Sequence, residues 1–406
     1  MPVAFQQAVL PNGLTIIAET DPAAHTSAAG FFVRTGARDE APGVMGVSHF
    51  LEHMMFKGTA KRTSDDVNRE FDAMGARANA YTSAEMTAFH AAVLPEFLPK
   101  AVELLADMMR PALRETDFAA EKSVILEEIA MYADDPVWVL YEKLLEEHYG
   151  QNRLSHRVLG TPQTIEAMSA EQMRGYFHDR YSADNTVVAL AGNVDFKSAV
   201  DQIGELCGRW QVTGATRDRG NFSFCERSTD LTDAKVARVY RMLIAPGPGA
   251  DDERRYAAFV LAQALGGPDN SRLHWALIET GLAEAADAGY DPRDGVGDLR
   301  VFLACEPDNL EEAWGIAERE IAGLKDAVTA KDVERIRARV ATGVTLAGEQ
   351  PDGRMHRIGR QWMYQQRYTT LQDELERINR VTVADVRRLV DEFPFHPSAV
   401  GTLRPA

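Results

Sequence analysis

Cysteine is scarce in this sequence. Three are present in 406 residues, and they are widely separated: Cys207, Cys225 and Cys305. An odd number of cysteines without a C-x-x-C pair argues against a disulfide framework and against a thiolate zinc site. We therefore expect free thiols.

Long apolar runs are also missing. No stretch of the sequence approaches the roughly 20 apolar residues that a membrane-spanning helix needs. The first residues, MPVAFQQAVLPNGL, lack the basic segment and the apolar core of a secretory signal peptide. We expect a cytoplasmic protein with no membrane partner.

Positive charge is in deficit. The chain has 44 Lys and Arg against 61 Asp and Glu, which gives a formal net charge of −17. Binding to nucleic acid requires clustered cations that neutralise phosphates, so we expect no nucleic-acid partner. The same negative field would attract a basic or unfolded peptide.

A repeat divides the chain into two halves. The segment GARDE, which begins at Gly36, recurs as GADDE from Gly249, 213 residues later. The same offset relates two sets of apolar residues with helical spacing: Ile165, Met168, Met173, Tyr176 and Phe177 in the first half, and Ile378, Val381, Val386, Leu389 and Val390 in the second. A chance recurrence of helical amphipathicity is the alternative. We favour a duplicated domain, with domains at 1–212 and 226–406 and a polar linker at 213–225.

Strand and helix patterns are mixed within each half. In the first half, the segments GLTIIAE, AAGFFVRTG, ANAYTS and TAFHAAVL are typical of strands, and residues 96–109 and 120–147 have helical periodicity. The second half repeats the mixture, with strands KVARVYRMLI and LRVFLACE and helices at 310–324 and from 333 onward. We expect an α+β fold of two homologous α/β-sandwich domains, each with a mixed, largely antiparallel sheet packed on helices.

The segment SHFLEHM holds the clearest candidate for a functional site. His49 and His53 are four residues apart, so a helix would place both imidazoles on one face with Glu52 beside them. Two neutral imidazoles suit zinc, and a catalytic zinc site needs a third protein ligand and a water. In a shuffled chain of this composition, H-x-x-(D/E)-H is expected roughly 0.04 times. The alternative is a solvated helical turn whose histidines bind nothing.

A candidate for the third ligand lies downstream. The segment EKSVILEEIAMYADDP carries Glu121 and Glu128 seven residues apart, so both fall on one helix face. Glu127 points about 100° away from Glu128. A carboxylate beside the apolar residues of this segment is either exposed at a rim or held by a cation.

Four segments together resemble one protein family. GVSHFLEHMMFKGT, ANAYTSAEMTAF, EKSVILEEIAMYADDP and YSADNTVVALAGNV look like motifs of the pitrilysin, insulin-degrading enzyme and mitochondrial processing peptidase family. These are the inverted (HxxEH) zinc metallopeptidases, and the chain is similar to their short bacterial two-domain type. The resemblance runs in order through most of the first half and more loosely through the second. It implies a zinc-dependent endopeptidase.

The resemblance also implies a role for each residue of the site. His49, His53 and Glu128 would bind one Zn²⁺ per chain. Glu52 would be the general base that takes a proton from the attacking water and later gives it to the leaving amine. Glu121 matches an acid of the family that orients a ligand or the substrate, and it counts with Glu52 among the expected catalytic residues.

Substrate binding follows from the same resemblance. Asn79, Ala80, Tyr81 and Thr82 match the family's edge strand, to which an extended peptide adds itself as a further β-strand. The expected substrates are peptides or unfolded polypeptides. Without the zinc motif nearby, these four residues would indicate an ordinary amphipathic strand.

The second half departs from the family pattern. Many members carry there S-R-L, then an Arg, then G-L-A-Y, and the Arg and Tyr hold the substrate backbone. Ser271–Leu273 and Gly281–Ala283 match at a spacing one residue shorter, but Glu284 replaces the Tyr and Ile278 or Glu279 replaces the Arg. We expect a homodimer with weak, broad activity. The alternative is a weakly active or non-catalytic subunit of a heterodimeric peptidase whose partner supplies the Arg and Tyr.

No second metal site is expected. The span 254–270, where the second half would carry a copy of the metal-binding helix, contains neither His nor Glu. His90 is expected in the packed core. The other histidines are expected at the surface or in structural roles: His25, His148, His156, His178, His274, His356 and His396.

Overall fold

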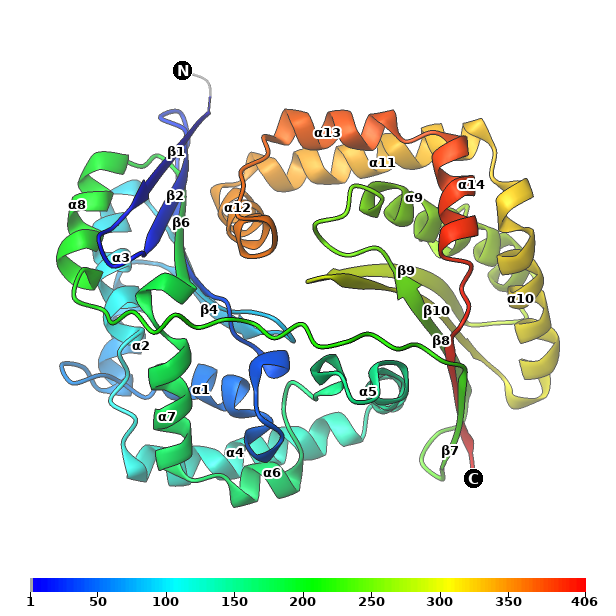
Figure 1. The fold of residues 1–406 in the computed structure, drawn as a ribbon, viewed down its shortest axis with the longest axis horizontal. Coiled ribbons are helices and arrows are strands. Elements are labelled where there is room, and N and C mark those ends of the chain that lie inside the picture. Colours follow the sequence, from blue (N-terminus) through cyan, green and yellow to red (C-terminus); the bar gives the residue numbers. More distant parts are fainter. Residues whose placement is uncertain (1–2) are drawn as a thin grey trace. The chain divides into compact units, whose positions relative to one another are not determined.

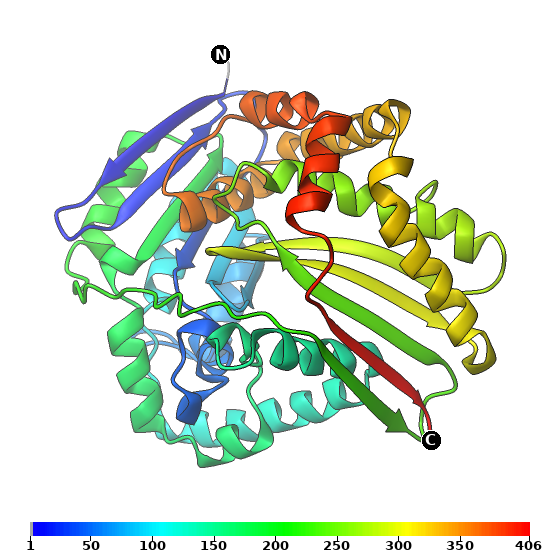
Figure 2. The ribbon, with the colours of Figure 1, turned by 45° about the vertical axis from the view of Figure 1, so that its right-hand side comes forward.

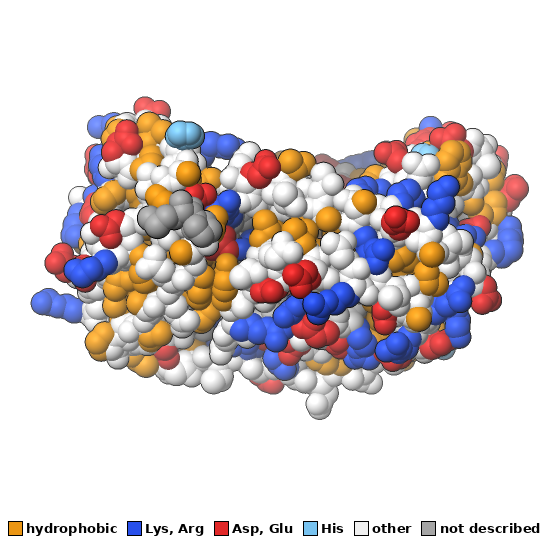
Figure 3. All heavy atoms as spheres, turned by 90° about the horizontal axis from the view of Figure 1, so that it is seen from above, with side chains coloured by type: hydrophobic (Ala, Val, Ile, Leu, Met, Phe, Trp, Pro, Cys, Tyr) orange, Lys and Arg blue, Asp and Glu red, His pale blue; other side chains and the backbone are white. Residues whose placement is uncertain are grey.

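Two β-sheets, each in its own unit, organise the structure. The computed structural model describes residues 3–406. The first unit contains residues up to Ala130, His156–Asp218 and Leu346–Thr369. The second unit contains Met131–Ser155, Arg219–Thr345 and Thr370–Ala406. On the face in Figure 3, Lys and Arg side chains are interspersed with Asp and Glu side chains.

The sheet of the first unit has six strands in the order β1-β2-β6-β3-β5-β4. Their bounds are β1 (Ala4–Val9), β2 (Thr15–Thr20), β3 (Ser27–Val33), β4 (Arg77–Thr82), β5 (Thr87–Val93) and β6 (Thr186–Gly192). β2 and β6 pair in parallel, and the other neighbouring strands pair antiparallel. The expected mixed, largely antiparallel sheet is confirmed, and β4 lies at its edge.

Helices cover both faces of this sheet. The first unit holds α1 (Val47–Met55), α2 (Ser64–Ala73), α3 (Leu98–Met108), most of α4 (Glu115–Ala133), α6 (Pro162–Ala167), α7 (Ala170–Arg180), α8 (Phe196–Cys207) and α12 (Pro351–Gln365). α1, α3 and α8 pack on one face of the sheet, and α12 packs on the other face (Figure 1). Alternate residues of each strand therefore enter different apolar cores.

The close approach of α12 to the sheet depends on two glycines. A Cβ atom at Gly359 of α12 would lie 2.3 Å from the Phe32 ring, and one at Gly30 of β3 would lie 2.5 Å from Sδ of Met355. Such distances are well below van der Waals contact, so larger side chains would push α12 away. Met355 and Ile358 of α12 are buried in the resulting core.

The second unit has a five-stranded sheet in the order β7-β11-β8-β10-β9. Its elements are β7 (Arg227–Asp233), β8 (Val239–Gly247), β9 (Ala285–Arg293), β10 (Val296–Cys305) and β11 (Ala399–Pro405), with α5 (Pro136–Tyr149), α9 (Arg255–Gly266), α10 (Leu310–Ala327), most of α11 (Ala330–Glu349), α13 (Leu371–Arg380) and α14 (Val383–Glu392). α9 and α5 pack on opposite faces of this sheet (Figure 2). β7 and β11 are parallel, as β2 and β6 are in the first unit.

The predicted repeat is present in the fold. The order β2-β6-β3-β5-β4 in the first sheet corresponds, strand by strand, to the order β7-β11-β8-β10-β9 in the second. The first sheet has β1 as an additional strand. β6 (Thr186–Gly192) and β11 (Ala399–Pro405) are related by the predicted offset of 213 residues. The fold class predicted from the sequence is therefore confirmed.

Two helix predictions need correction. Residues 120–147 form two helices, because α4 ends at Ala133 and α5 begins at Pro136. Proline lacks the N–H that a continuing helix would need, and Oδ1 of Asp135 instead accepts hydrogen bonds from the N–H groups of Val137 and Trp138. The amphipathic stretch of each half near residues 165–177 and 378–390 is likewise divided, into α6 and α7 and into α13 and α14.

The breaks in the two stretches have the same local cause. Ser169 caps α7 and Thr382 caps α14, and each cap forms a reciprocal capping box, with Gln172 and Asp385 respectively. The two capping residues are also separated by 213 positions. The repeat therefore extends to single capping residues.

Two helices, α5 and α12, belong to a different compact unit from the one that the predicted ranges 1–212 and 226–406 would give them. α5 lies within the first predicted range and packs on the second sheet, whereas α12 lies within the second range and packs on the first sheet. A sequence repeat locates homologous segments but does not reveal on which sheet each apolar helix face packs. The ranges thus remain a prediction about the repeat.

The segment between α8 and β7 forms no helix or strand in the described chain. None of the helices within residues 3–406 is both long and apolar enough to cross a membrane.

Candidate metal centre

α1 presents the histidine pair. His49 and His53 lie one turn apart on this helix, while Phe50, Leu51 and Met54 face the core of the first unit. The helix begins after Gly46, whose φ of 92° lies in the left-handed region. A Cβ atom there would also lie 2.6 Å from the carbonyl oxygen of Leu159, so glycine fixes the start of the helix.

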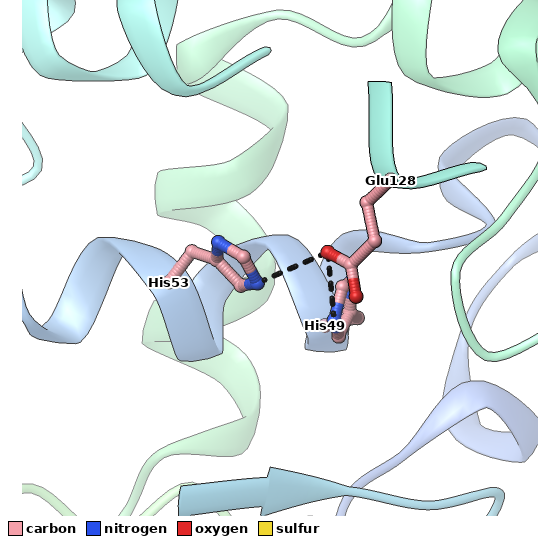
Figure 4. A group of neighbouring side chains, drawn as sticks. All are labelled: His49, His53 and Glu128. Carbon is pink, nitrogen blue, oxygen red and sulfur yellow. Dashed lines mark ion pairs between the residues drawn. The ribbon is translucent and has the colours of Figure 1, made fainter. Parts of the chain in front are cut away.

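α4 brings Glu128 to the two histidines (Figure 4). Oε2 of Glu128 is 3.7 Å from Nε2 of His49 and 3.4 Å from Nε2 of His53. Two atoms that bind one zinc ion at about 2.1 Å lie roughly 3.4 Å apart in tetrahedral geometry. The three predicted ligands therefore have the donor atoms and the spacing that fit zinc. Glu127, the neighbouring acid, is exposed.

Glu121 contacts the ring of His53 on the side away from Glu128, and Lys57 contacts Glu121. Nδ1 of His53 lies 2.9 Å from Oε1 of the buried Glu121, which leaves Nε2 for a metal. Oε2 of Glu121 forms an ion pair with Lys57. Lys57 was not predicted, although a basic residue four positions after His53 was a visible signal that a carboxylate could be paired there.

Glu52 is placed beside the ligands but is oriented by the edge strand. Its Oε2 accepts a 2.6 Å hydrogen bond from Oγ1 of Thr82, the last residue of β4. Burial raises the pKa of Glu52, and the hydrogen bond from Thr82 opposes this change. Burial, with repulsion from His53, lowers the pKa of His49 to about 4, so its imidazole is neutral near pH 7.

The four predicted substrate-binding residues lie on the edge strand but face two ways. The side chain of Thr82 contacts Glu52, and Ala80 enters the core that α1 covers. Tyr81 packs against the core on the α12 side, and Asn79, two residues away, has the same orientation. Of these four side chains, Thr82 therefore has the direct link to Glu52, the predicted general base.

The second unit has no equivalent of the histidine pair in α9. This helix is apolar and largely buried, and the span 254–270 lacks His and Glu. The segment that departs from the family pattern forms a π-helix, His274–Ile278. Glu279 lies 3.2 Å from His274, and Glu284 forms an ion pair with Arg238.

Two other histidines are not isolated. His90, expected in the core, and His356, expected to lack a partner, lie together with Asp352. The prediction for His356 overlooked the spacing of Asp352 and His356, which places them four residues apart on one helix.

Two imidazole nitrogens and a carboxylate oxygen, with a second carboxylate beside them, are the set of groups that metal-dependent hydrolases use. Comparisons with known proteins identify the family. Residues 15–162 match the family described as insulinase (peptidase family M16), and residues 167–340 match the peptidase M16 inactive domain. The chain belongs to this peptidase family, and the resemblance seen in the sequence is confirmed.

Full-length relatives agree with this assignment. An uncharacterized zinc protease of Streptomyces coelicolor is 33% identical, over 98% of this chain and 90% of the relative. An uncharacterized zinc protease of Bacillus subtilis is 29% identical, over 97% of both chains. The crystal structure of a protease from Helicobacter pylori matches the fold with a TM-score of 0.92 at 19% identity, over 100% of both chains.

Proposed function

We propose that this protein is a zinc-dependent endopeptidase that hydrolyses peptides or unfolded polypeptides. The convergence of His49, His53 and Glu128, with Glu52 beside them, carries the proposal. The relatives named zinc proteases support the choice of metal. A non-catalytic role is disfavoured because all four residues are present and correctly spaced.

Each residue has a defined task in this mechanism. His49, His53 and Glu128 would hold zinc, which supplies polarisation of the scissile carbonyl and acidification of a water. Glu52 accepts the proton of the attacking water and then donates it to the leaving amine. Thr82 fixes the carboxylate of Glu52 through its hydroxyl, and Glu121 fixes the ring of His53.

The position of β4 supports binding of the substrate as an added strand. β4 is the edge of its sheet, and its last residue is hydrogen-bonded to the general base. A peptide that pairs with the free edge of β4 would thus be guided toward Glu52 by backbone hydrogen bonds, with little dependence on sequence.

The test of the activity uses an unstructured peptide with both termini blocked and an internal fluorophore–quencher pair. We expect cleavage within the peptide by the zinc-loaded chain, loss of cleavage after chelation, and recovery when zinc is restored. A folded, zinc-loaded chain that cleaves no such peptide, alone or mixed with a homologous subunit, would contradict the proposal.

The test of strand addition compares that peptide with versions N-methylated at single backbone positions near the cleavage site. Each methyl group removes one hydrogen-bond donor, so methylation at alternate positions should raise KM and leave the intervening positions almost unaffected. A uniform response along the peptide contradicts the added-strand mode.

Assembly forms the second part of the proposal. We favour a homodimer, because closed two-fold assemblies are the commonest state of oligomeric proteins. The alternative is a heterodimer whose partner supplies the Arg and Tyr that this chain lacks. Sedimentation of the purified chain over a range of concentrations distinguishes a self-associating chain from a monomer that requires a partner.

The Arg and Tyr of the family pattern, which this chain lacks, can be introduced to test whether they matter for activity. Ile278 packs against the core of the second unit, whereas the side chain of Glu279 is 53% exposed, so Glu279 is the tolerant site for Arg. The variant combines Glu279→Arg, one residue inserted after Thr280, and Glu284→Tyr, and the insertion alone is its control. A higher kcat/KM on extended peptides supports a missing clamp, and no gain in a folded variant contradicts it.

A further inference from the structure

Three side chains of the first unit meet on the sheet face that α12 covers. His90 lies on β5, and Asp352 and His356 lie one turn apart on α12. Nδ1 of His90 is 3.7 Å from Oδ1 of Asp352, and Nε2 of His356 is 3.8 Å from the same oxygen. The three potential ligand atoms all lie within 4.8 Å of one another.

These atoms converge without bonding one another. Distances of 3.7 and 3.8 Å are too long for hydrogen bonds. Nδ1 of His90 and Oδ1 of Asp352 are buried, and neither makes a hydrogen bond within the described residues 3–406. Buried polar atoms are nearly always satisfied in native proteins, so two unsatisfied atoms that face each other call for a missing partner.

The spacing is close to that of the candidate zinc ligands on α1 and α4. There, the carboxylate oxygen lies 3.4 and 3.7 Å from the two imidazole nitrogens. In both clusters two histidines and one carboxylate share the arrangement, and in both a pair of ligands is four residues apart on one helix. These two clusters are the groups of this kind that the described chain contains.

The backbone explains why the three residues meet. His90 pairs across the sheet with Gly30, which has no side chain, and Gly359 allows α12 to approach the same strands closely. The rings of His90 and His356 lie edge to face with their centroids 4.3 Å apart. The arrangement therefore depends on sheet and helix packing and not on a mobile loop.

We propose that His90, Asp352 and His356 form a second metal site, which binds a divalent ion of the zinc type and ties α12 to β5. Two imidazole nitrogens and one carboxylate oxygen suit Zn²⁺, Co²⁺ or Ni²⁺, whereas Ca²⁺ and Mg²⁺ prefer ligands that are all oxygen. The Asp352 side chain is 41% exposed, so water can reach the ion as a fourth ligand.

The charges around the two sites differ. Burial lowers the pKa of His90 to about 4, and burial also lowers the pKa of His356, so both rings are neutral near pH 7 and able to bind metal. Arg360 adds a positive charge near His356, whereas near the first site Lys57 pairs with Glu121 and the carboxyl group of Glu52 lies beside the ligands. The second site therefore binds its ion more weakly and loses it first to a chelator.

The test measures zinc bound per chain in the full-length, untagged protein. We expect two ions in the wild type, one in the variant that combines His49→Ala with His53→Ala, and none when Asp352→Asn is added to that variant. Asp352→Asn preserves side-chain size at a half-exposed position. In a second background, His49→Gln with His53→Gln replaces the alanine changes, so a folding defect in one background does not decide the result.

His274→Ala is the matched control, because His274 also lies near a carboxylate, at 3.2 Å, but belongs to no group of three ligands. In the background without the first site, this variant should still bind one ion. In the same background, cobalt in place of zinc should give the visible absorption of a four-coordinate site. Adding Asp352→Asn should remove that absorption.

The link between α12 and β5 has its own measurement. At zinc concentrations about 100 times the dissociation constant, hydrogen exchange that requires opening of α12 should slow roughly 100-fold, and exchange in α8 should not change. The proposal is overturned by a folded protein that binds no second ion, by a second ion that persists in Asp352→Asn, or by exchange in α12 that does not respond to zinc.

Discussion

The two units are built on the same strand order, yet the first presents a candidate metal centre and the described residues of the second have no counterpart of it. At the offset of 213 residues, His49, Glu52 and His53 of α1 are replaced by Ala262, Leu265 and Gly266 of α9. The three replacements are buried. A Cβ atom at Gly266 would lie 2.2 Å from the backbone nitrogen of Ala288, so no histidine fits there.

This difference shows that a helix carrying metal ligands has fewer apolar side chains for packing. Both helices are largely buried, but α1 carries the polar side chains of His49, Glu52 and His53 along one face, whereas α9 is apolar at the equivalent positions. A helix that is apolar on every side is stabilised by packing and has no face left for ligands. The shared scaffold thus sets the position of the helix, and the side chains on that helix decide whether the position can bind a metal.

The largest expected effect is in the chemistry of α1. Glu52→Gln should retain zinc, because Glu52 is not a ligand, and should lower kcat by about 10² or more, because proton transfer is lost. Peptide cleavage and zinc content are measured on the same preparation. Near-normal turnover with stoichiometric zinc would show that the base has been wrongly assigned.

A somewhat smaller effect should separate two neighbouring acids of α4. Glu128→Gln should weaken zinc binding by roughly 10², because a neutral amide is a poor ligand. Glu127→Gln, an exposed change on another helix face, is the control and should bind zinc normally. Competition with a chelator gives both affinities, and equal losses in the two variants would contradict the observed register.

The orientation of His53 can be tested across the two units. Glu121→Gln should lower zinc affinity or activity about 10-fold to 100-fold, because the amide supports the ring less well than the carboxylate. Glu334, at the offset of 213 residues in the second unit, is exposed, and Glu334→Gln is the matched control without an expected effect. A comparable loss in Glu334→Gln would mean that the effect does not come from the metal centre.

The smallest effect should be the same in both units. Ser169→Ala and Thr382→Ala remove equivalent helix caps, and each should destabilise its helix by about 1 kcal/mol. Hydrogen exchange in α7 and α14 measures each unit separately, and Ser123→Ala at an exposed position inside α4 is the control. If one of the two substitutions leaves hydrogen exchange in its helix unchanged, the caps of the two units are not equivalent.

Much of the fold could be read from the sequence because its signals are local or periodic. The strands at 15–20, 27–33, 77–82 and 87–93 are short runs rich in apolar and β-branched residues, and the repeat at 213 residues indicated two homologous domains. The helix break at Pro136 was missed, although proline was visible, because the periodicity continued on both sides of it.

The candidate zinc centre could also be anticipated. His49 and His53 share a helix, so their alignment follows from helical geometry alone. Glu128 was found through its spacing from Glu121 and through family resemblance. The roles of Lys57 and Thr82 around the centre could not be predicted, since they depend on how separate elements pack.

The sequence by itself determined most of the elements of this protein, its division into two homologous halves and the residues of α1 and α4 that suit a metal. These properties follow from hydrophobic period, from capping residues and from spacing along single helices. Only the tertiary structure decided that α12 packs on the first sheet and α5 on the second, because apolar helix faces do not specify their partner. That packing also brings His90 of β5 to Asp352 and His356, residues more than 250 positions away, and no local pattern could have joined them.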